Sequence, residues 1–213
     1  MHQRTKSRID ALLIPDDRPI LAIDADEVIL LFAQDFDAWL RPRDVWFDYN
    51  LYDYSVALKD RDGRSLGFET ADALVQRFNI EGTRHHKPAP GAVEALKVLQ
   101  AFYTIIVLTN VPMSCWKDRE ANFADLGLDL PIIANVGPKG PALSYIQSRS
   151  PAATLFVDDN PNQIASAAQY APNVTRIHFT GCDRLRPTLP HAKQAQHRPQ
   201  SWAELTDLLT SGF

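Results

Sequence analysis

The sequence predicts an α/β fold in which a parallel sheet lies between two layers of helices. Short apolar runs alternate with segments of helical periodicity from about residue 88 onward. Two apolar runs, residues 20–24 and 153–157, lead into closely spaced aspartates. Residues 43–88 lack this alternation and are rich in aromatic side chains. This pattern is typical of a three-layer, Rossmann-like sheet with a small, mostly helical cap inserted after the first strand.

Composition limits the class of protein. The chain has 213 residues, of which 45% are hydrophobic, and its formal net charge is −4. These values suit one globular domain with an insert and argue against disorder or a nucleic-acid polymer as partner. No apolar run approaches the ~20 residues of a membrane span, and the basic first eight residues lack the apolar core of a signal peptide. We therefore expect a cytoplasmic protein with no membrane partner; the oligomeric state stays open.

The elements of the first half follow from apolar spacing. Apolar residues predict a short helix over 9–14 and a buried strand over 20–24. Helical spacing over 28–40 ends at Arg41-Pro42-Arg43. A further helix is predicted over 71–78, and the Pro88-Ala89-Pro90-Gly91 turn precedes a helix that runs to residue 99.

The second half alternates regularly between strands and helices. Strands are predicted over residues 103–108, 132–134, 153–157 and 174–179, and helices over 114–126, 139–148 and 161–170. Residues 181–200 are rich in Pro, Arg and His and predict a loop. Ser201 with Glu204 three residues later is a capping box for a last helix.

The same pattern divides the chain into two parts. Residues 1–30 and 88–213 are predicted to form the catalytic core, and residues 31–87 the small cap. Two interpretations of the aromatic side chains in the cap stay open. They either fill the core of a small helical unit, or one or two of them stack on a flat substrate.

Carboxylates gather at one predicted sheet edge. Asp24 and Asp26 follow the first strand, and Asp158 and Asp159 follow the strand over 153–157. Parallel strands bring their carboxyl ends to the same edge, where open α/β folds place their sites. Close carboxylates repel each other unless a cation compensates them, and oxygen ligands suit Mg²⁺. The sequence therefore predicts a magnesium site and phosphate chemistry.

Each polar group at this edge has a role in phosphoryl transfer. Asp24 is a candidate nucleophile that forms an aspartyl-phosphate, and Asp26 a candidate general acid and base. The Thr109 hydroxyl and Lys139 are candidates for binding the phosphoryl oxygens and balancing their charge. Simpler interpretations exist for each group taken alone. Asp-x-Asp is common in turns, Asp158-Asp159-Asn160-Pro161 suits a helix cap, and a lysine in a Gly/Pro turn is usually solvated.

Taken together, these motifs resemble the haloacid-dehalogenase-like superfamily of phosphatases. The motifs are Asp24-Ala25-Asp26-Glu27-Val28, Thr109-Asn110, Lys139 and Val157-Asp158-Asp159. The resemblance covers residues 19–180 and implies Asp24 as nucleophile and Asp26 as general acid/base. It also implies Mg²⁺ on Asp24, the backbone carbonyl of Asp26 and the Asp158/Asp159 pair. True dehalogenases lack the second acid of the first motif, so Asp26 favours phosphate chemistry.

A narrower resemblance concerns the substrate. Asp24 to Val28, Phe32 and the segment 88–94 look like the 5'(3')-deoxyribonucleotidase branch. That branch implies an aromatic ring against the base at Phe32, and Asn110 is the second residue that we expect to contact substrate. Glu27 departs from the branch, which more often has glycine there. His85 and His86, at the exit of the cap, are expected to lie in a solvated hinge.

The resulting hypothesis is a Mg²⁺-dependent phosphomonoester hydrolase that acts through an aspartyl-phosphate on a small phosphorylated metabolite. A nucleoside monophosphate is the first substrate hypothesis. A phosphotransferase or phosphomutase on the same scaffold is one alternative, in which a hydroxyl other than water's takes the phosphoryl group from Asp24. A non-catalytic, ligand-binding regulatory relative is the other.

Overall fold

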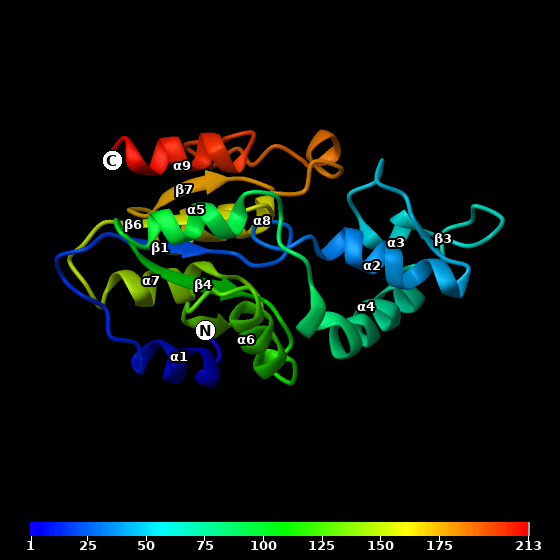
Figure 1. The fold of residues 1–213 in the computed structure, drawn as a ribbon, viewed down its shortest axis with the longest axis horizontal. Coiled ribbons are helices and arrows are strands. Elements are labelled where there is room, and N and C mark those ends of the chain that lie inside the picture. Colours follow the sequence, from blue (N-terminus) through cyan, green and yellow to red (C-terminus); the bar gives the residue numbers. More distant parts are fainter. Residues whose placement is uncertain (213) are drawn as a thin grey trace.

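The computed structural model describes residues 1–212 and confirms the predicted α/β fold. Within this part of the chain, five parallel strands form one sheet in the order β5-β4-β1-β6-β7. Figure 1 shows that the strands run toward the side of the molecule where residues 31–87 lie. The strands are β1 (Ile20–Ile23), β4 (Thr104–Thr109), β5 (Ile132–Ala134), β6 (Thr154–Asp158) and β7 (Thr175–His178).

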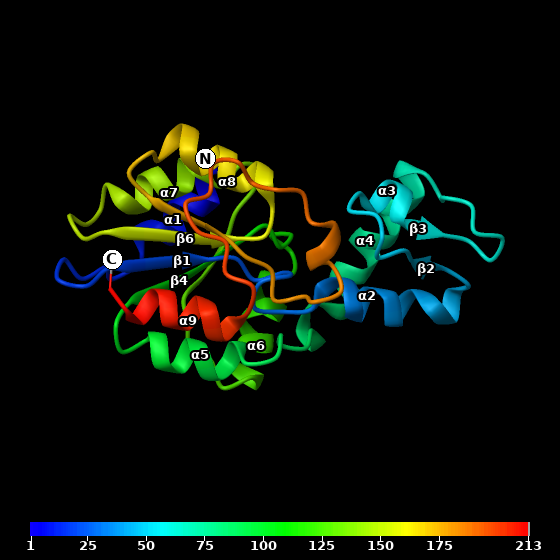
Figure 2. The ribbon, with the colours of Figure 1, turned by 90° about the horizontal axis from the view of Figure 1, so that it is seen from above.

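Helices cover both faces of the sheet (Figure 2). One face is covered by α5 (Ala92–Leu99), α6 (Trp116–Asp125) and α9 (Trp202–Thr210), and the other by α1 (Gln3–Asp10), α7 (Gly140–Gln147) and α8 (Pro161–Tyr170). Leu21 and Ile23 of β1 pack on the first face, while Ile20 and Ala22 pack on the second. Both faces of β1 are therefore buried, which explains its continuous apolar run. None of the helices in residues 1–212 combines the length and apolar character that crossing a bilayer requires.

The first helix lies earlier in the chain than its apolar residues predicted. Helix α1 spans Gln3–Asp10, whereas the prediction was 9–14. The imidazole of His2 accepts a hydrogen bond from the Arg4 amide and caps the helix. This cap, at an uncommon residue type, allows a short polar helix that buries Thr5 and Ile9. Leu12 and Ile14 pack against the sheet without helical backbone.

The helix after the first strand also starts later than predicted. Helix α2 spans Phe32–Leu40 and not 28–40. Residues before it form a tight turn, in which the amides of Ile29 and Leu30 both donate to the Ala25 carbonyl. At the other end of the chain, the predicted cap of α9 is confirmed. The Ser201 hydroxyl accepts from the Glu204 amide at 3.1 Å.

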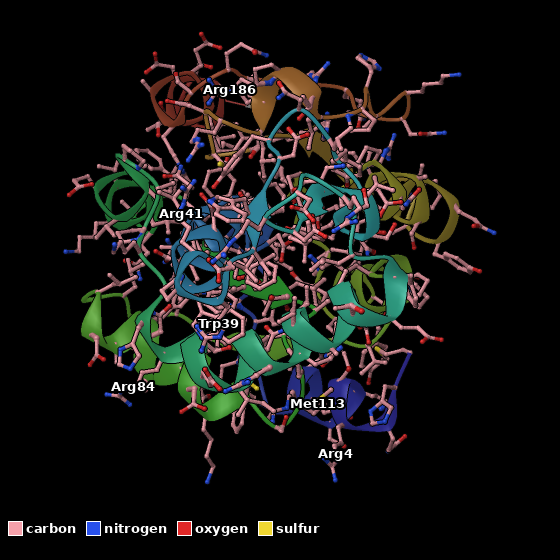
Figure 3. All side chains as sticks on the ribbon, turned by 90° about the vertical axis from the view of Figure 1, so that its right-hand side faces the viewer. Arg4, Trp39, Arg41, Arg84, Met113 and Arg186 are labelled. Carbon is pink, nitrogen blue, oxygen red and sulfur yellow. The ribbon has the colours of Figure 1, made fainter. Side chains whose placement is uncertain are left out.

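Residues 31–87, which we call the cap segment, lie beside the carboxyl ends of the strands (Figure 1). The segment holds more helix than predicted and a small hairpin that was not predicted, because two-residue strands carry no readable alternation. Seen from this side, Trp39 on α2 faces the viewer and Arg84 extends outward (Figure 3). After α2, its elements are the 3-10 helix η1 (Arg41–Arg43), β2 (Trp46–Phe47), α3 (Tyr54–Ala57), β3 (Leu58–Lys59), α4 (Phe68–Gly82) and the 3-10 helix η2 (Thr83–His85).

An aromatic cluster fills the interior of the cap segment. The ring centroids of Phe36 and Phe78 lie 5.0 Å apart, and those of Phe32 and Phe78 lie 5.2 Å apart. Phe36 is completely buried, and Phe32 is 6% exposed. These phenylalanines therefore serve as core residues, which small units need because they bury little other surface.

The two chain crossings that connect the cap segment to the core are hydrogen-bonded to each other. The Leu31 amide donates to the Lys87 carbonyl at 2.9 Å, and the Ala89 amide donates to the Ile29 carbonyl at 2.8 Å. In addition, the Lys87 amide donates to Asp35 of α2 at 2.7 Å. The chain thus leaves and re-enters the core at one place.

Gly140 provides a stability test of the α7–α8 contact. A Cβ at this position would lie 2.2 Å from the Ser166 carbonyl oxygen, and the Gly140 amide donates to the Ser166 hydroxyl at 3.0 Å. We expect Gly140→Ala to lower the free energy of unfolding by about 2 kcal/mol, because rigid backbone has to shift. Urea unfolding measures this. Gln169→Ala, at an exposed position of α8, should change the free energy by less than about 0.5 kcal/mol. Equal stability of both variants would contradict the packing described.

Candidate active site

A buried lysine joins two of the predicted aspartates. Lys139 lies immediately before α7, Asp24 follows β1, and Asp158 ends β6. The Lys139 Nζ donates to Asp24 Oδ1 and to Asp158 Oδ2, both at 2.7 Å. Lys139 is 1% exposed, and Asp158 is completely buried. Three segments far apart in the sequence thus meet at the carboxyl edge of the sheet.

Asp159 completes a group of three carboxylates. One oxygen from each of Asp24, Asp158 and Asp159 lies within 4.8 Å of the others. Asp158 also accepts a hydrogen bond from the Asn160 amide at 2.8 Å, whereas Asp159 lines the cavity described below. Three carboxylates around a single lysine leave an excess of negative charge. This all-oxygen donor set fits a divalent cation such as Mg²⁺.

The pKa values within this group reflect burial first and the neighbouring charges second. Burial raises the pKa of Asp24 to about 7, although Lys139 opposes the shift. Burial and the neighbouring Asp158 also raise the pKa of Asp159 well above its ordinary value. Burial by itself would lower the pKa of Lys139, but Asp158 and Asp24 outweigh it and raise that pKa. A cation near Asp24 and Asp159 would therefore relieve repulsion.

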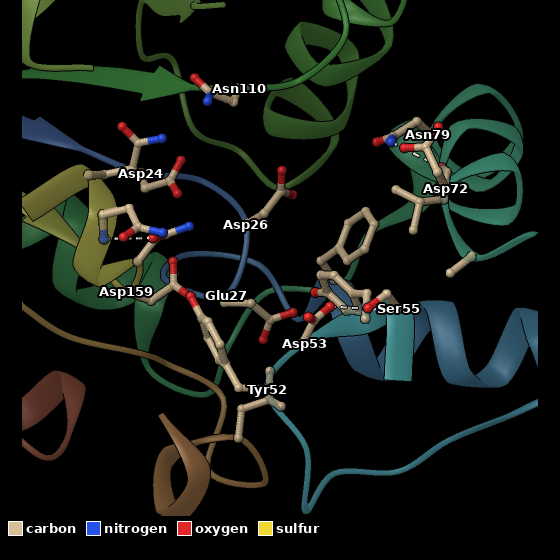
Figure 4. A pocket seen from close by; sticks show the side chains of 18 of the residues that line it. Asp24, Asp26, Glu27, Tyr52, Asp53, Ser55, Asp72, Asn79, Asn110 and Asp159 are labelled. Carbon is tan, nitrogen blue, oxygen red and sulfur yellow. Dashed lines mark hydrogen bonds between the residues drawn. The ribbon is translucent and has the colours of Figure 1, made fainter. Parts of the chain in front are cut away.

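Asp26 has different partners from Asp24. Its Oδ1 accepts from Arg119 Nη2 at 2.6 Å and lies 3.7 Å from His86 Nδ1. Arg119 is completely buried on α6, and its Nη1 lies 3.2 Å from the same nitrogen of His86. In Figure 4 the Asp26 carboxylate is turned away from those of Asp159 and Glu27. Asp26 is therefore held by an ion pair outside the Lys139 cluster.

Sequence reasoning missed Arg119 and misjudged His86. His86 is 2% exposed, so the prediction that both histidines lie in a solvated hinge was wrong for this residue, while His85 is exposed. The error came from the run of polar residues around it, which hides a contact across the core. Arg119 had one signal: it shares a helix face with Cys115 and Asn122 and Phe123, all of them buried.

The Arg119 contact controls the charge on Asp26. Burial would raise the pKa of Asp26, but the Arg119 guanidinium outweighs burial and holds that pKa at about 2. Asp26 is consequently a carboxylate at neutral pH in this arrangement. The two acids of the first motif thus have opposite electrostatic environments, although they are two residues apart.

Thr109 and Asn110 follow β4 and are placed differently. Thr109 is completely buried, and its hydroxyl oxygen accepts from the Val111 amide at 3.3 Å. Asn110 lines the cavity. Its side chain donates to the Gly137 carbonyl at 2.9 Å and accepts from the Asn135 amide group at 3.0 Å. Asn110 thus ties the loop after β4 to the turn that carries Lys139.

A cavity of about 630 Å³ lies between the sheet edge and the cap segment (Figure 4). Asp24, Asp26, Lys139 and Asp159 line its core side. Phe32 also lines it, but its ring packs against Phe78 and, with centroids 5.3 Å apart, against His86. Since Phe32 is 6% exposed, little of its ring is free to contact a ligand.

Glu27 joins the core loop to the cap segment. Its backbone has φ 62°, in the left-handed region that favours glycine, and its side chain is 5% exposed. Oε1 accepts from the Ala33 amide in the first turn of α2, and Oε2 has no hydrogen-bond partner among residues 1–212. Burial raises the pKa of Glu27 to about 8. Glu27 therefore combines a strained backbone with an unused buried oxygen at the cavity wall.

Comparison with family models and with curated sequences gives no match. The fold can therefore be compared only through solved structures.

Solved structures similar to this chain share the haloacid-dehalogenase-like fold. L-2-haloacid dehalogenase from Xanthobacter autotrophicus, with chloropropionic acid covalently bound, has a TM-score of 0.58 and 16% identity, covering 92% of this chain and 99% of that one. A haloacid dehalogenase-like protein of unknown function from Agrobacterium tumefaciens has a TM-score of 0.59 and 15% identity, covering 90% and 97%. A candidate β-phosphoglucomutase from Bacteroides vulgatus has a TM-score of 0.52 and 14% identity, covering 99% and 98%.

These neighbours include hydrolases, a dehalogenase and a mutase, at identities that establish the fold and leave the reaction open. The predicted resemblance is confirmed at this level, whereas the nucleotidase branch stays a prediction. The chain has the fold of the haloacid-dehalogenase-like superfamily.

Proposed function

We propose that this protein is a Mg²⁺-dependent phosphomonoester hydrolase that acts through an aspartyl-phosphate on a small phosphorylated metabolite. One observation carries the proposal. Lys139 joins Asp24 and Asp158 while Asp159 lies beside them, at the wall of a cavity large enough for a small ester. A nucleophilic carboxylate, a fixed positive charge and a set of oxygen ligands are the parts that phosphoryl transfer needs.

The metal site of this proposal rests on the carboxylate group. Asp24, Asp158 and Asp159 would hold Mg²⁺, with the backbone carbonyl of Asp26 as the fourth ligand that the family resemblance implies. When bound, Mg²⁺ neutralises charge on the phosphoryl oxygens and orients them. The other contributions come from side chains of this chain.

Asp24 has one oxygen available for attack. Both of its hydrogen-bond donors, the Ala25 amide and Lys139, bind Oδ1 at 2.7 Å. This leaves Oδ2 to form the bond to phosphorus while the bond from phosphorus to the ester oxygen breaks. Lys139 holds the carboxylate in place and balances part of the added charge. Water then attacks the phosphorus, releases phosphate and restores the Asp24 carboxylate.

Asp26 acts on the leaving oxygen in this scheme. The ester oxygen must take up a proton as it leaves, and Asp26 is the acid that the motif supplies. A carboxylate paired with a buried guanidinium carries no proton. We therefore infer that Asp26 donates a proton only after its 2.6 Å contact with Arg119 is broken and its carboxylate has taken up a proton from solvent water. Movement of His86, which lies at the exit of the cap segment, would loosen the same contact.

The lining of the cavity favours a phosphatase over a dehalogenase. A 2-haloacid carries a carboxylate that needs a cation beside the reacting carbon. Among the described residues that line the cavity, Lys139 is the only cation, and it already binds Asp24 and Asp158. A substrate whose negative charge is neutralised by a metal on the carboxylates fits this lining better. In a phosphatase, Asp26 would have the role described above, as the acid that gives a proton to the leaving oxygen.

Two alternatives share much of the same geometry. A phosphotransferase or phosphomutase would pass the phosphoryl group from Asp24 to a second hydroxyl, and a non-catalytic relative would only bind the ligand. The nucleoside monophosphate stays a hypothesis, and the burial of Phe32 gives it no support. Assays with and without a hydroxyl acceptor separate these cases.

Asp24→Asn tests the nucleophile. We expect wild-type protein to hydrolyse p-nitrophenyl phosphate with Mg²⁺, and the variant to lose roughly a thousandfold in kcat or more, because an amide is a poor nucleophile. Asp129→Asn, at an exposed acid outside the cavity, should keep wild-type activity. Circular dichroism checks that both variants fold. Full activity of Asp24→Asn would remove this residue from its role, and inactive wild-type protein would favour the non-catalytic alternative.

Metal binding has a readout that needs no turnover. With free Mg²⁺ at about 100 times its Kd, binding should stabilise the folded chain by about 2.7 kcal/mol and raise the Tm by several degrees. Asp159→Asn should reduce this shift strongly, because it removes one of three carboxylates. Asp129→Asn serves as the control and should keep the shift. A Tm that does not respond to Mg²⁺ in wild-type protein would contradict the metal site.

The Asp26–Arg119 pair predicts a dependence of stability on pH. The folded pKa of about 2 lies below the ordinary value of 3.8, so Asp26 stabilises the folded state above about pH 4 and loses this contribution as the pH falls toward 2. The full contribution is roughly 2 kcal/mol, and about half is lost by pH 3. Urea unfolding with EDTA at pH 3 and 6 measures it. The difference in the free energy of unfolding between wild type and Asp26→Asn should shrink by about 1 kcal/mol at the lower pH. A difference that is the same at both pH values would contradict the ion pair between Asp26 and Arg119.

A further inference from the structure

Among the described residues that line the cavity, its cap side has carboxylates but no cation beside its aromatic and apolar side chains. Asp53 precedes α3, Asp72 lies on α4, and Glu27 lies where the core loop meets α2; all three line the cavity. Figure 4 shows Asp53 and Asp72 on the side opposite Asp24 and Asp159. The part of a substrate that extends from the phosphate toward the cap segment therefore meets carboxylates.

Cations of the cap segment lie elsewhere. Its arginines pair with acids outside the cavity, as in Arg61 with Asp44 at 2.8 Å and Arg77 with Glu81 at 2.7 Å. Arg64 likewise pairs with Asp60 at 3.2 Å. None of these arginines is among the described residues of the cavity wall. Glu27, Asp53 and Asp72, which we call the acidic wall, are thus a local feature of the cavity, since the cap segment itself has several basic residues.

Two carboxylates of this wall have capacity for a ligand. Glu27 is 5% exposed, and its Oε2 finds no hydrogen-bond donor in residues 1–212. The exposed carboxylate of Asp72 makes no hydrogen bond or ion pair within the same residues, whereas Asp53, also exposed, uses one oxygen to accept from the Ser55 amide at 2.8 Å. Of the three acids, Glu27 alone is buried. A buried carboxyl oxygen without a partner is unfavourable, and a donor or cation on the ligand would satisfy it.

Aromatic rings accompany these acids. Phe68 and Asp72 lie four residues apart on α4, so they share one face of the helix, and Phe68 is 72% exposed. Tyr52 makes no ring contact in the described chain, and its ring extends toward Asp159 in Figure 4. Carboxylates interleaved with free aromatic faces are typical of sites that bind ammonium groups through ion pairing and cation–π contact.

On these grounds, and resting on the proposed function, we propose that the substrate is the phosphate ester of a small amino alcohol. Its phosphate lies at Asp24 and its ammonium group lies among Glu27, Asp53 and Asp72. Leaving groups that carry a carboxylate or a second phosphate are disfavoured, because the cap side offers them repulsion and no cation. Neutral leaving groups of the same shape would bind less well, because they cannot form ion pairs with these carboxylates.

Matched substrates test the charge alone. O-phosphocholine and 3,3-dimethylbutyl phosphate have nearly the same shape, but only the first carries a positive charge, and 3-carboxypropyl phosphate carries a negative one. We expect kcat/KM for O-phosphocholine to exceed that for the neutral ester about tenfold or more, and the carboxylated ester to be the poorest. Equal values for the first two esters, or a faster carboxylated ester, would overturn the inference. So would a nucleoside monophosphate that is hydrolysed faster than O-phosphocholine.

Variants of the acidic wall locate the preference. Asp72→Asn and Asp53→Asn should each lower the ratio of the two kcat/KM values several-fold, since each removes one charge and keeps the shape of the side chain. Glu27→Gln should lower it as well, because it replaces a buried carboxyl oxygen that has no hydrogen-bond partner among residues 1–212 with an amide. The amide side chains introduced by Asp53→Asn and Glu27→Gln retain an oxygen that can accept the hydrogen bonds from the Ser55 and Ala33 amides. Asp44→Asn is the matched control, because Asp44 is an exposed acid of the same segment outside the cavity. An unchanged ratio in all three cavity variants would overturn the assignment.

A binding measurement separates this inference from the proposed function. Isothermal titration compares choline with 3,3-dimethyl-1-butanol, its neutral analogue, and needs no hydrolysis. Tighter binding of choline by about tenfold, lost in Asp72→Asn, supports the cation site even if no phosphate ester is turned over, in which case only the proposed function fails. Equal or undetectable binding of both alcohols contradicts the cation site, even if p-nitrophenyl phosphate is hydrolysed.

Discussion

The ion pairs of Lys139 with Asp24 and Asp158 are the constraint on which the site depends. A buried lysine with a single partner, or two buried aspartates without a cation, would be strongly destabilising. Strands β1 and β6 are direct neighbours in the sheet, and Ile23 lies opposite Val157 in their register. Asp24 and Asp158 then follow at the same level, and the start of α7 brings Lys139 between them. Asp159, one residue further on, lies at the cavity wall, and the ion pairs that Lys139 forms in residues 1–212 are with Asp24 and Asp158 instead.

Local patterns were sufficient to predict the sheet and the four motifs at its edge. Apolar strands that run into aspartates are readable because both the strand and its end lie within a few residues. The contacts of Asp26 were not readable in this way, since Arg119 follows it by 93 residues and His86 lies on another segment. A charged residue on a buried helix face is a signal only when the partner that compensates it is known. The predicted boundaries of α1 and α2 were wrong for a related reason. The side chains of His2 and Glu27 accept hydrogen bonds from amides in the first turns of these helices, and neither residue type is common at helix N-termini in this role.

Two neighbouring acids therefore have contrasting electrostatic environments within one motif. Asp24 is held by a lysine that it shares with Asp158, and burial raises its pKa to about 7. Asp26 is held by Arg119, and its pKa is about 2. Since His86 touches the second pair and lies at the exit of the cap segment, the state of Asp26 is linked to the position of that segment. In the function that we propose, this link would connect the binding of a leaving group to the proton that the leaving oxygen needs.

The paired crossings at residues 29–31 and 87–89 have a consequence for how such a chain can vary. Because Leu31 and Lys87 are directly hydrogen-bonded, the two ends of the cap segment are already held together where they join the core. The free energy of closing a loop rises only slowly with its length, by about 0.6 kcal/mol for each doubling. Insertions, deletions or wholesale exchange between these two points would thus leave the sheet and its lysine–aspartate cluster almost undisturbed. The segment between these two points can therefore vary while the lysine–aspartate cluster at the sheet edge is retained.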